Sequence, residues 1–303
     1  MINKTEQEIM KNWQGDISEP VVSICCITYN HEQYISEAIN SFLMQETDFP
    51  FEVVIGEDCS TDNTRKIVEK YKEMYPNIIK LIVSENNVGM QANGQRTMEA
   101  CIGEYMALCE GDDYWTDKNK LQIQKDFLES NPEYIICYTD VEAFNENGII
   151  QDYIGGATKD LTADELKKAT PINTLTTMYR NIMKDKFSAE FKASKYGDLF
   201  IWSILGYYGK GKYLPQIKPA RYRVHSGGVH SGTSQIDKYD NTLITYSLLL
   251  SYHKKLGSSH IVEYFRQEIL WLLLRNNFKS FLVSFLIRVK NKILRWLKND
   301  RKN

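Results

Sequence analysis

Short apolar runs alternate with amphipathic stretches through the first 140 residues, and no other feature restricts the possible fold as strongly. The run "VVSICCI" (21–27) is typical of a strand buried on both faces, whereas the apolar residues of "EQYISEAINSFLMQ" (32–45) recur at helical spacing. Further strands are expected at 51–56, 78–84, 104–109 and 134–138, and further helices at 62–75, 91–102 and 117–130. This alternation predicts an α/β, Rossmann-like fold with a mostly parallel sheet flanked by helices.

The second half of the chain is less regular. Residues 139–185 are mixed and polar, and we expect loops or a variable insertion there. "FSAEFKASKYGDLFIWSILGYYGKGKYL" (187–214) predicts a helix, a turn at Gly197-Asp198, a second helix and a strand. "RYRVHSGGVHSG" (221–232) has the composition of a mobile loop, and a helical C-terminal extension is expected from about residue 234.

Polar segments follow the expected strands, with the sequences "TYNHEQ", "EDCSTDNT", "ENNVG" and "EGDDYW". In open α/β sheets ligands bind beyond the carboxyl ends of the strands, so these segments are the expected site. None contains the G-x-G-x-x-G of a dinucleotide fold or the G-x-x-x-x-G-K-[ST] of a phosphate loop. The sequence therefore disfavours hydride transfer and ATP hydrolysis.

Three carboxylates, those of Glu110, Asp112 and Asp113, directly follow the apolar run "YMAL". Carboxylates crowded at the end of a buried strand repel one another and resist desolvation, so we expect a positive group, most simply a divalent cation, to share the site. The alternative is a turn that caps the helix expected at 117.

The ordered motifs "VVSICCITYNHEQYISEAINSFLMQ", "FEVVIGEDCSTDNT", "NVGMQANGQRTMEA" and "GEYMALCEGDDYW" resemble those of family 2 glycosyltransferases. The resemblance covers about residues 20–140 and continues more loosely to about 230. It implies a GT-A fold, a nucleotide-sugar donor that is usually UDP-linked, and an inverting, metal-dependent transfer without a covalent enzyme intermediate. The implied acceptor is a hydroxyl of a glycan or lipid-linked glycan in bacterial surface polysaccharide synthesis, such as a capsule or O-antigen.

The resemblance also implies roles for residues near the first two strands. Thr28, Tyr29, Asn30 and Glu32 would line the nucleotide pocket, and Asp58 would accept a hydrogen bond from the base. A carboxylate that reads the N–H of uracil is physically suited to discriminate between bases. The alternatives are that Tyr29 packs in the core and that Asp58 helps to cap the following helix.

The acidic segment "EGDDYW" resembles the metal motif of the family, with Glu110 where an Asp is usual. Asp113 would be the main ligand of Mn²⁺ or Mg²⁺, assisted by Asp112, and the cation would bridge the donor diphosphate. Glu110 is expected to contact the ribose or the metal. Trp115 either floors the sugar pocket or belongs to the core, and Arg96 either contacts the diphosphate or forms a surface ion pair.

Direct displacement at a sugar carbon needs a base for the acceptor hydroxyl. The segment "KYGDLFIW" resembles the family segment that carries this base, so Asp198 is the candidate, with an ordinary helix N-cap as the alternative. The segment "YRVHSGG" resembles a family loop that closes over the bound nucleotide, in which His225 would complete the metal site or touch the diphosphate. Arg223 would contact the diphosphate.

The chain is expected to consist of a catalytic domain over 1–232 and a helical extension over 233–303. The catalytic domain would comprise a nucleotide-sugar half at about 20–140 and an acceptor half at about 141–232. The polar N-terminal segment lacks the apolar core of a secretory signal, so we expect a cytoplasmic protein. Nucleic acid is not an expected partner.

The C-terminal tail is basic on an otherwise acidic chain. Between Arg275 and Asn303, nine Lys and Arg residues stand against Asp300, which gives this tail a net charge of +8. Its longest uncharged run, 280–287, is too short to span a bilayer. We expect the tail to bind the anionic inner face of the cell membrane peripherally; the alternative is a helix packed on the catalytic domain.

The resemblance therefore implies a hexosyl- or N-acetylhexosaminyltransferase. A nucleotidyltransferase that forms sugar nucleotides would share the α/β fold, but it needs a Gly-rich basic loop that "TYNHEQY" does not provide. A carbohydrate-binding protein without catalysis is the other alternative, and such a protein has no need for a base such as Asp198.

Overall fold

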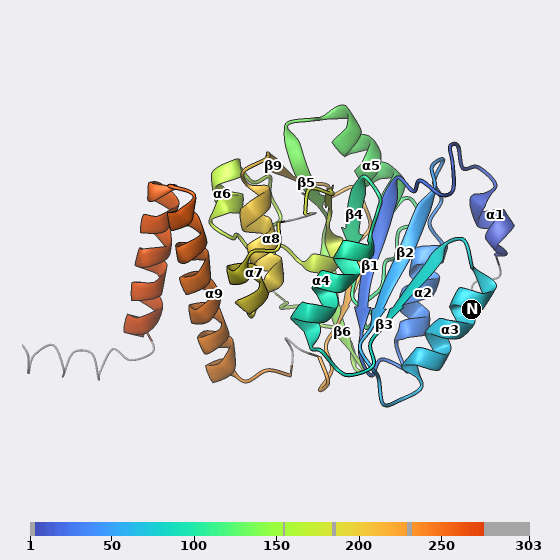
Figure 1. Cartoon of the computed structure of the whole chain (residues 1–303), viewed down its shortest axis with the longest axis horizontal. Helices are drawn as coiled ribbons and strands as arrows, with labels where there is room; N and C mark the ends of the chain where they lie inside the picture. Colours follow the sequence, from blue (N-terminus) through green and yellow to red (C-terminus); the bar gives the residue numbers. More distant parts are fainter. Residues whose placement is uncertain (1–3, 154, 184–185, 229–231, 276–303) are drawn as a thin grey trace, which may run out of the picture.

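A computed structural model describes residues 4–153, 155–183, 186–228 and 232–275 (Figure 1). Seven strands form one sheet in the order β3-β2-β1-β4-β8-β5-β9. They are β1 (Val22–Thr28), β2 (Phe51–Glu57), β3 (Ile79–Val83), β4 (Tyr105–Leu108), β5 (Tyr134–Tyr138), β8 (Met178–Arg180) and β9 (Lys210–Tyr213). In this sheet β8 is antiparallel to both neighbours, and the other adjacent pairs are parallel. The predicted mostly parallel sheet is confirmed.

Helices cover both faces of this sheet (Figure 1). Those between the first five strands are α2 (Ile35–Leu43), α3 (Thr64–Met74), α4 (Met90–Ala100) and α5 (Lys120–Ser130), within the ranges expected from the sequence or one residue outside them. The short α1 (Glu6–Met10) precedes β1 and begins with a capping box between Thr5 and Glu8. α4 lies close to β2 because Gly56 has no side chain, and a Cβ there would stand 1.9 Å from Oγ1 of Thr97.

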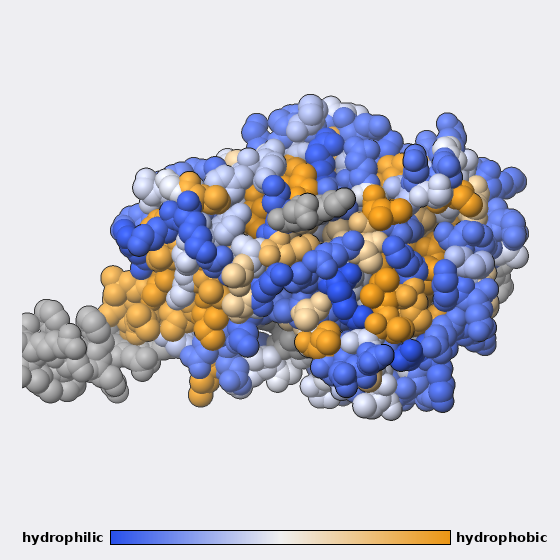
Figure 2. Space-filling view, viewed as in Figure 1, coloured by the Kyte–Doolittle hydropathy of each residue, from blue (hydrophilic) through white to orange (hydrophobic). Residues whose placement is uncertain are grey.

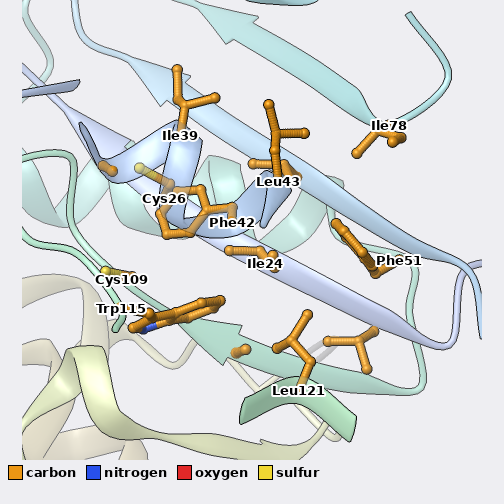
Figure 3. Packing of buried hydrophobic residues seen from close by; sticks show 14 of the residues in the cluster. Ile24, Cys26, Ile39, Phe42, Leu43, Phe51, Ile78, Cys109, Trp115 and Leu121 are labelled. Carbon is orange, nitrogen blue, oxygen red and sulfur yellow. The ribbon is translucent and has the colours of Figure 1, made fainter. Parts of the chain in front are cut away.

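Two hydrophobic clusters lie on opposite faces of the sheet. Ile24 and Cys26 of β1 join the cluster under α2, α3 and α5, whereas Cys25 joins the cluster with α4 and α8, since successive strand residues point to opposite faces. Figure 3 shows Ile24 and Cys26 near Ile39 and Phe42 of α2. β1 is therefore buried on both faces, and its carboxyl end lies between elements that pack on either side of the sheet.

Residues 139–185 hold more structure than expected. They contain β6 (Val141–Asn145), β7 (Gly148–Ile149), α6 (Ala163–Lys167), a 3₁₀ turn (Thr174–Thr176) and β8. The expectation of loops was wrong because these elements are two to five residues long, too short to show a period, and because β8 pairs with the distant strands β4 and β5.

A second sheet has the strand order β10-β6-β7, where β10 is Ala220–Arg223. The predicted loop at 221–232 therefore begins as a strand. β10 pairs in parallel with β6, and Tyr114 bridges to Arg221. This small sheet brings the segment after β10 to the carboxyl end of β4.

The segment 187–214 forms α7 (Ala189–Ala193), α8 (Gly197–Leu205) and β9, as predicted. The turn expected at Gly197-Asp198 is instead the first turn of α8, because the helix already begins at Gly197.

The helical extension is confirmed as far as residue 275, with α9 (Gln235–Lys255) followed by a helix over 259–275. Leu249 of α9 and Phe265 of the last helix share a hydrophobic cluster with Phe200 and Trp202 of α8. None of the helices in the described ranges combines the length and the apolar character needed to cross a bilayer.

Candidate active site

The acidic segment after β4 is fixed to the end of β1. The backbone N–H of Cys109 donates to the carbonyl of Cys25, and that of Gly111 donates to the carbonyl of Ile27. A Cβ at Gly111 would stand 2.8 Å from the Thr28 hydroxyl oxygen, so glycine permits this close approach. Glu110, Asp112 and Asp113 are therefore carried on a backbone that the central strand holds in place.

The acidic segment contributes three carboxylates to a cavity of about 680 Å³ beyond the strand ends. Burial and the charge of Asp112 raise the pKa of Glu110 to about 8. Burial, then Asp112 and Glu110, raise the pKa of Asp113 well above its usual value. The surrounding residues thus do not supply enough positive charge to stabilise the ionised forms of Glu110 and Asp113.

Asp112 differs from its neighbours because two histidines face it. His225 Nε2 lies 3.1 Å and His31 Nε2 3.8 Å from Oδ2 of Asp112. Burial alone would raise the pKa of Asp112, but the hydrogen bond with His225 and the charge of His31 hold it below its usual value. The predicted neighbourhood of Asp112 and His225 is present, although the two groups contact each other directly.

Arg223 lies at the carboxyl end of β10 and reaches the same segment. Its backbone N–H donates to Oδ1 of Asp113 at 2.7 Å, and its Nε donates to the carbonyl of Asp112 at 2.9 Å. The guanidinium also forms an ion pair with Glu37 and lies over the ring of Tyr34 at 4.6 Å. Arg223 lines the cavity while bracing the acidic segment.

The residues fit a divalent cation by their chemistry. No group of three or more His, Cys, Asp or Glu side chains in the described ranges is already arranged around one point as metal ligands. The raised pKa of Asp113 nevertheless shows a buried oxygen donor that a cation would stabilise. Carboxylate oxygens and an imidazole are ligands suited to Mn²⁺, and carboxylates to Mg²⁺.

The residues expected to hold the nucleotide divide into two groups. Thr28, Tyr29 and Asp58 line the cavity. The Thr28 hydroxyl is buried and makes no hydrogen bond to any described residue, and Tyr29 is 39% exposed, which argues against a core role. Asp58 accepts hydrogen bonds from the backbone N–H groups of Val88 and Gly89, so it also shapes the cavity wall rather than capping a helix.

Asn30, Glu32 and Arg96 do not line the cavity. Asn30 and Glu32 accept hydrogen bonds from the backbone N–H groups of Thr61 and Asn63. The Arg96 guanidinium donates to the carbonyls of Val83 and Glu57 and to the Asn93 side chain. The polar groups of these three side chains brace the loops after β1, β2 and β3, and their direct contact with the donor stays a prediction.

Trp115 belongs to the core. It is 2% exposed, its indole N–H donates to the carbonyl of Leu175 at 2.7 Å, and its ring meets Phe42 edge to face with the ring centroids 5.0 Å apart (Figure 3). The expected alternative of a floor for the sugar pocket is therefore wrong. The sequence does not indicate whether an aromatic residue next to an acidic motif points into the core or toward the ligand.

Asp198 lines the cavity from the first turn of α8, and burial raises the pKa of its carboxyl. Glu110 and Asp198 line the same cavity, and the charge of Asp198 also raises the pKa of Glu110. The N-cap position of α8 is Tyr196, so Asp198 stands inside the first turn of the helix rather than at its N-cap.

Sequence reasoning missed several residues of the wall. His31 belongs to the segment "TYNHEQ" after β1, and its Nδ1 is buried without a partner among the described residues. Gln91 packs against Gly197 beside Asp198 and donates to the carbonyl of Ser194. No local pattern marks Gln91, because its role depends on the packing of α4 against α8.

Comparisons with known proteins agree with this geometry. A model of the family described as "Glycosyl transferase family 2" matches residues 23–187. The uncharacterized protein Rv1520 of Mycobacterium tuberculosis is 40% identical over 161 residues, which are 52% of this chain and 46% of that protein. The chain thus spans about half the length of the relatives that it matches first.

Two further matches are informative. The Escherichia coli UDP-Glc:alpha-D-GlcNAc-diphosphoundecaprenol beta-1,3-glucosyltransferase WfgD is 30% identical over 186 residues, 61% of this chain and 70% of that protein. The crystal structure of Staphylococcus aureus TarS 1–349 in complex with UDP-GlcNAc superposes with a TM-score of 0.59 at 22% identity, covering 84% of this chain and 72% of that one. The second likeness shows a shared fold and confirms the expected GT-A architecture.

Proposed function

The chain belongs to glycosyl transferase family 2, and on that premise we propose that it transfers a sugar from a UDP-linked donor to a hydroxyl of a glycan or lipid-linked acceptor. The acceptor would be part of a bacterial surface polysaccharide. The observation that carries this proposal is one cavity that holds Glu110, Asp112, Asp113 and Asp198 together with Thr28 and Asp58. These residues come from three strand ends and a helix far apart in the sequence, and a binding protein would have no need for the buried acid of Asp198.

Thr28, Tyr29 and Asp58 would hold the nucleoside. The exposed ring of Tyr29 can cover a base, the free hydroxyl of Thr28 can meet a polar group, and Asp58 keeps lone pairs for a base N–H. Support for a UDP-linked donor comes from WfgD, whose name specifies UDP-Glc, and from TarS, which was crystallised with UDP-GlcNAc. A hexosyl or N-acetylhexosaminyl group is the sugar class that these names suggest.

Asp113, Asp112 and His225 would hold Mn²⁺ or Mg²⁺ at the donor diphosphate. A bound cation would neutralise charge on the leaving nucleoside diphosphate. Arg223 would face the same phosphates from β10. Glu110 would contact the ribose or the cation. The acidic segment, braced by Arg223, keeps these groups in place before the donor binds.

Asp198 would take the proton of the acceptor hydroxyl as that oxygen attacks the sugar carbon. Burial raises its pKa, which makes its carboxylate a stronger base than an exposed Asp. Direct attack from the face opposite the diphosphate inverts the configuration at the sugar carbon and needs no covalent enzyme intermediate.

Membrane contact through the tail is part of the proposal, with the enzyme at the cytoplasmic face. The tail at 276–303 lies outside the described residues, but the helix before it carries Leu270, Trp271 and Leu273, which are 52%, 52% and 42% exposed. Figure 2 shows apolar side chains gathered over the C-terminal helices. Apolar residues followed by a basic sequence suit an anionic lipid surface.

A donor panel tests the proposed function. UDP-glucose, UDP-galactose, UDP-GlcNAc, UDP-GalNAc, GDP-mannose and dTDP-glucose are each incubated with the protein and Mn²⁺, and nucleotide release is followed with and without a membrane extract as acceptor source. Acceptor-stimulated release from a UDP-sugar supports the proposal. Release from GDP-mannose or dTDP-glucose alone would contradict the donor class.

A further inference from the structure

The cavity extends past Asp198 to the N-terminal half of α9. Lys238, Thr242 and Tyr246 line it there, spaced four residues apart and hence on one face of the helix. None of these residues lies in the range matched by the family model, which ends at 187. The family match therefore gives no information about this part of the cavity wall.

Hydrogen bonds join this face of α9 to the segment that carries Asp198. The backbone N–H of Tyr196 and the hydroxyl of Ser194 both donate to Oγ1 of Thr245, at 3.2 and 3.4 Å. The Tyr196 hydroxyl reaches the carbonyl of Lys238 at 3.5 Å. Because Tyr196 is two residues before Asp198, α9 and the proposed base are held as one unit.

Two basic side chains of the cavity wall, those of Arg223 and Lys238, differ in whether they already have a partner. The carboxylates of the wall are those of Asp58, Glu110, Asp112, Asp113 and Asp198. The Arg223 guanidinium is already engaged by Glu37 and by the carbonyl of Asp112. The Lys238 ammonium, by contrast, forms no ion pair with any residue in the described ranges, and its side chain is half-buried at the wall.

We infer that Lys238 binds an anionic group, a phosphate or a carboxylate, on the acceptor substrate. This inference rests on the proposed function, since it takes the acceptor hydroxyl to lie at Asp198. Because Asp198 and Lys238 line the same cavity, a ligand that extends from Asp198 along it would meet this face of α9. The apolar side chains of Phe191, Ile201 and Tyr246 also line the cavity and lower the local polarity, which strengthens an ammonium–anion contact.

The alternative is an ordinary solvated lysine, and Lys254 provides the matched control. Lys254 lies on the same helix, is exposed and does not line the cavity. Lys238→Met and Lys254→Met remove the same charge from α9 and keep a side chain of similar length. Lys238→Arg keeps the charge.

The experiment measures binding by isothermal titration, with the protein saturated with UDP and Mn²⁺ so that the donor site is filled. The probes are octyl glucoside, octyl glucuronide and octyl diphosphate below their micellar concentrations. We expect at least one anionic probe to bind the wild type about tenfold or more tightly than octyl glucoside. Glucuronide binding would identify a carboxylate and diphosphate binding a phosphate.

The variants then decide the role of Lys238. Lys238→Met should abolish the preference for the anionic probe, whereas Lys254→Met and Lys238→Arg should keep it. Equal binding of all three probes to the wild type, or an unchanged preference in Lys238→Met, would overturn the inference. Failure of UDP to bind the wild type would instead contradict the proposed donor site, so the two failures are distinguishable.

Discussion

The carboxylate of Asp113 accepts a hydrogen bond from the backbone N–H of Arg223 at 2.7 Å, across 110 residues of sequence. This bond joins the acidic segment after β4 to the end of β10, outside the range of the family match. The site is therefore completed by the second, smaller sheet. Changes in either segment are expected to affect the same ligand.

Asp198→Asn is expected to lower the turnover number by about 10²- to 10⁴-fold, since an amide cannot accept the hydroxyl proton. The affinity for UDP should be unchanged, because the amide has nearly the same shape. Initial rates of UDP release and UDP titrations measure the two quantities. Asp126→Asn, on the surface of α5, is the control, and a drop of equal size in that variant would contradict the role of Asp198.

Gly56 of β2 and Gly94 of α4 should respond oppositely to alanine. Gly56→Ala would place a Cβ 1.9 Å from Oγ1 of Thr97 and should lower the free energy of unfolding by about 1–3 kcal/mol. Gly94→Ala meets no atom within 4 Å and should raise it by up to about 1 kcal/mol, because alanine favours the helix. Urea unfolding measures both; a stabilising Gly56→Ala would refute the close packing of α4 on β2.

His253 should make the fold sensitive to acid. Its ring lies between the hydroxyls of Ser203 and Tyr207, each 2.7 Å away, and burial, with a smaller effect of Lys167, lowers its pKa from 6.5 to about 4. Between about pH 6.5 and pH 4, His253 binds a proton more readily in the unfolded chain than in the folded protein. The free energy of unfolding therefore falls as the pH decreases through this range. The contribution is up to about 3 kcal/mol.

Urea unfolding at pH 7, 5.5 and 4.5 checks this loss. Burial also lowers the pKa of His31, which contributes in the same direction. His253→Gln removes one of the two groups and should make the dependence on pH shallower. An identical slope in the variant and the wild type would show that His253 carries none of it.

The tail should bind anionic vesicles. Lys290/Lys292→Gln is expected to weaken binding to vesicles containing phosphatidylglycerol by about tenfold or more, since each cation near such a surface contributes about 1 kcal/mol. Vesicle sedimentation at low and high salt measures this. Lys66/Lys70→Gln, on exposed positions of α3, is the matched control, and a wild type that binds neutral and anionic vesicles equally would contradict the proposal.

The first half of the fold could be read from the sequence because its elements are local and long. The buried run of β1 and the helical spacing of α2 each specify their structure without reference to distant residues. β8 could not be found this way, since it is three residues long and is stabilised by pairing with β4 and β5.

The candidate site was predictable where a motif carries the chemistry. Asp112, Asp113 and Asp198 line the cavity as expected. Arg96 and Trp115 could not be placed, because a side chain near a motif can point toward the ligand or toward the core, and packing decides which. Lys238 carries no motif, and its position depends on how α9 docks on α8.

The most direct test of the central claim is a thermal-shift titration of UDP with and without Mn²⁺ on the wild type and on Asp113→Asn. A ligand that binds only the folded state raises the unfolding midpoint. At a hundredfold excess over its Kd, it raises the free energy of unfolding by about 2.7 kcal/mol. We predict that UDP with Mn²⁺ stabilises the wild type more than UDP alone, and that Asp113→Asn removes this difference. A midpoint that UDP and Mn²⁺ leave unchanged in the wild type would contradict the claim that the acidic segment binds a nucleotide through a metal.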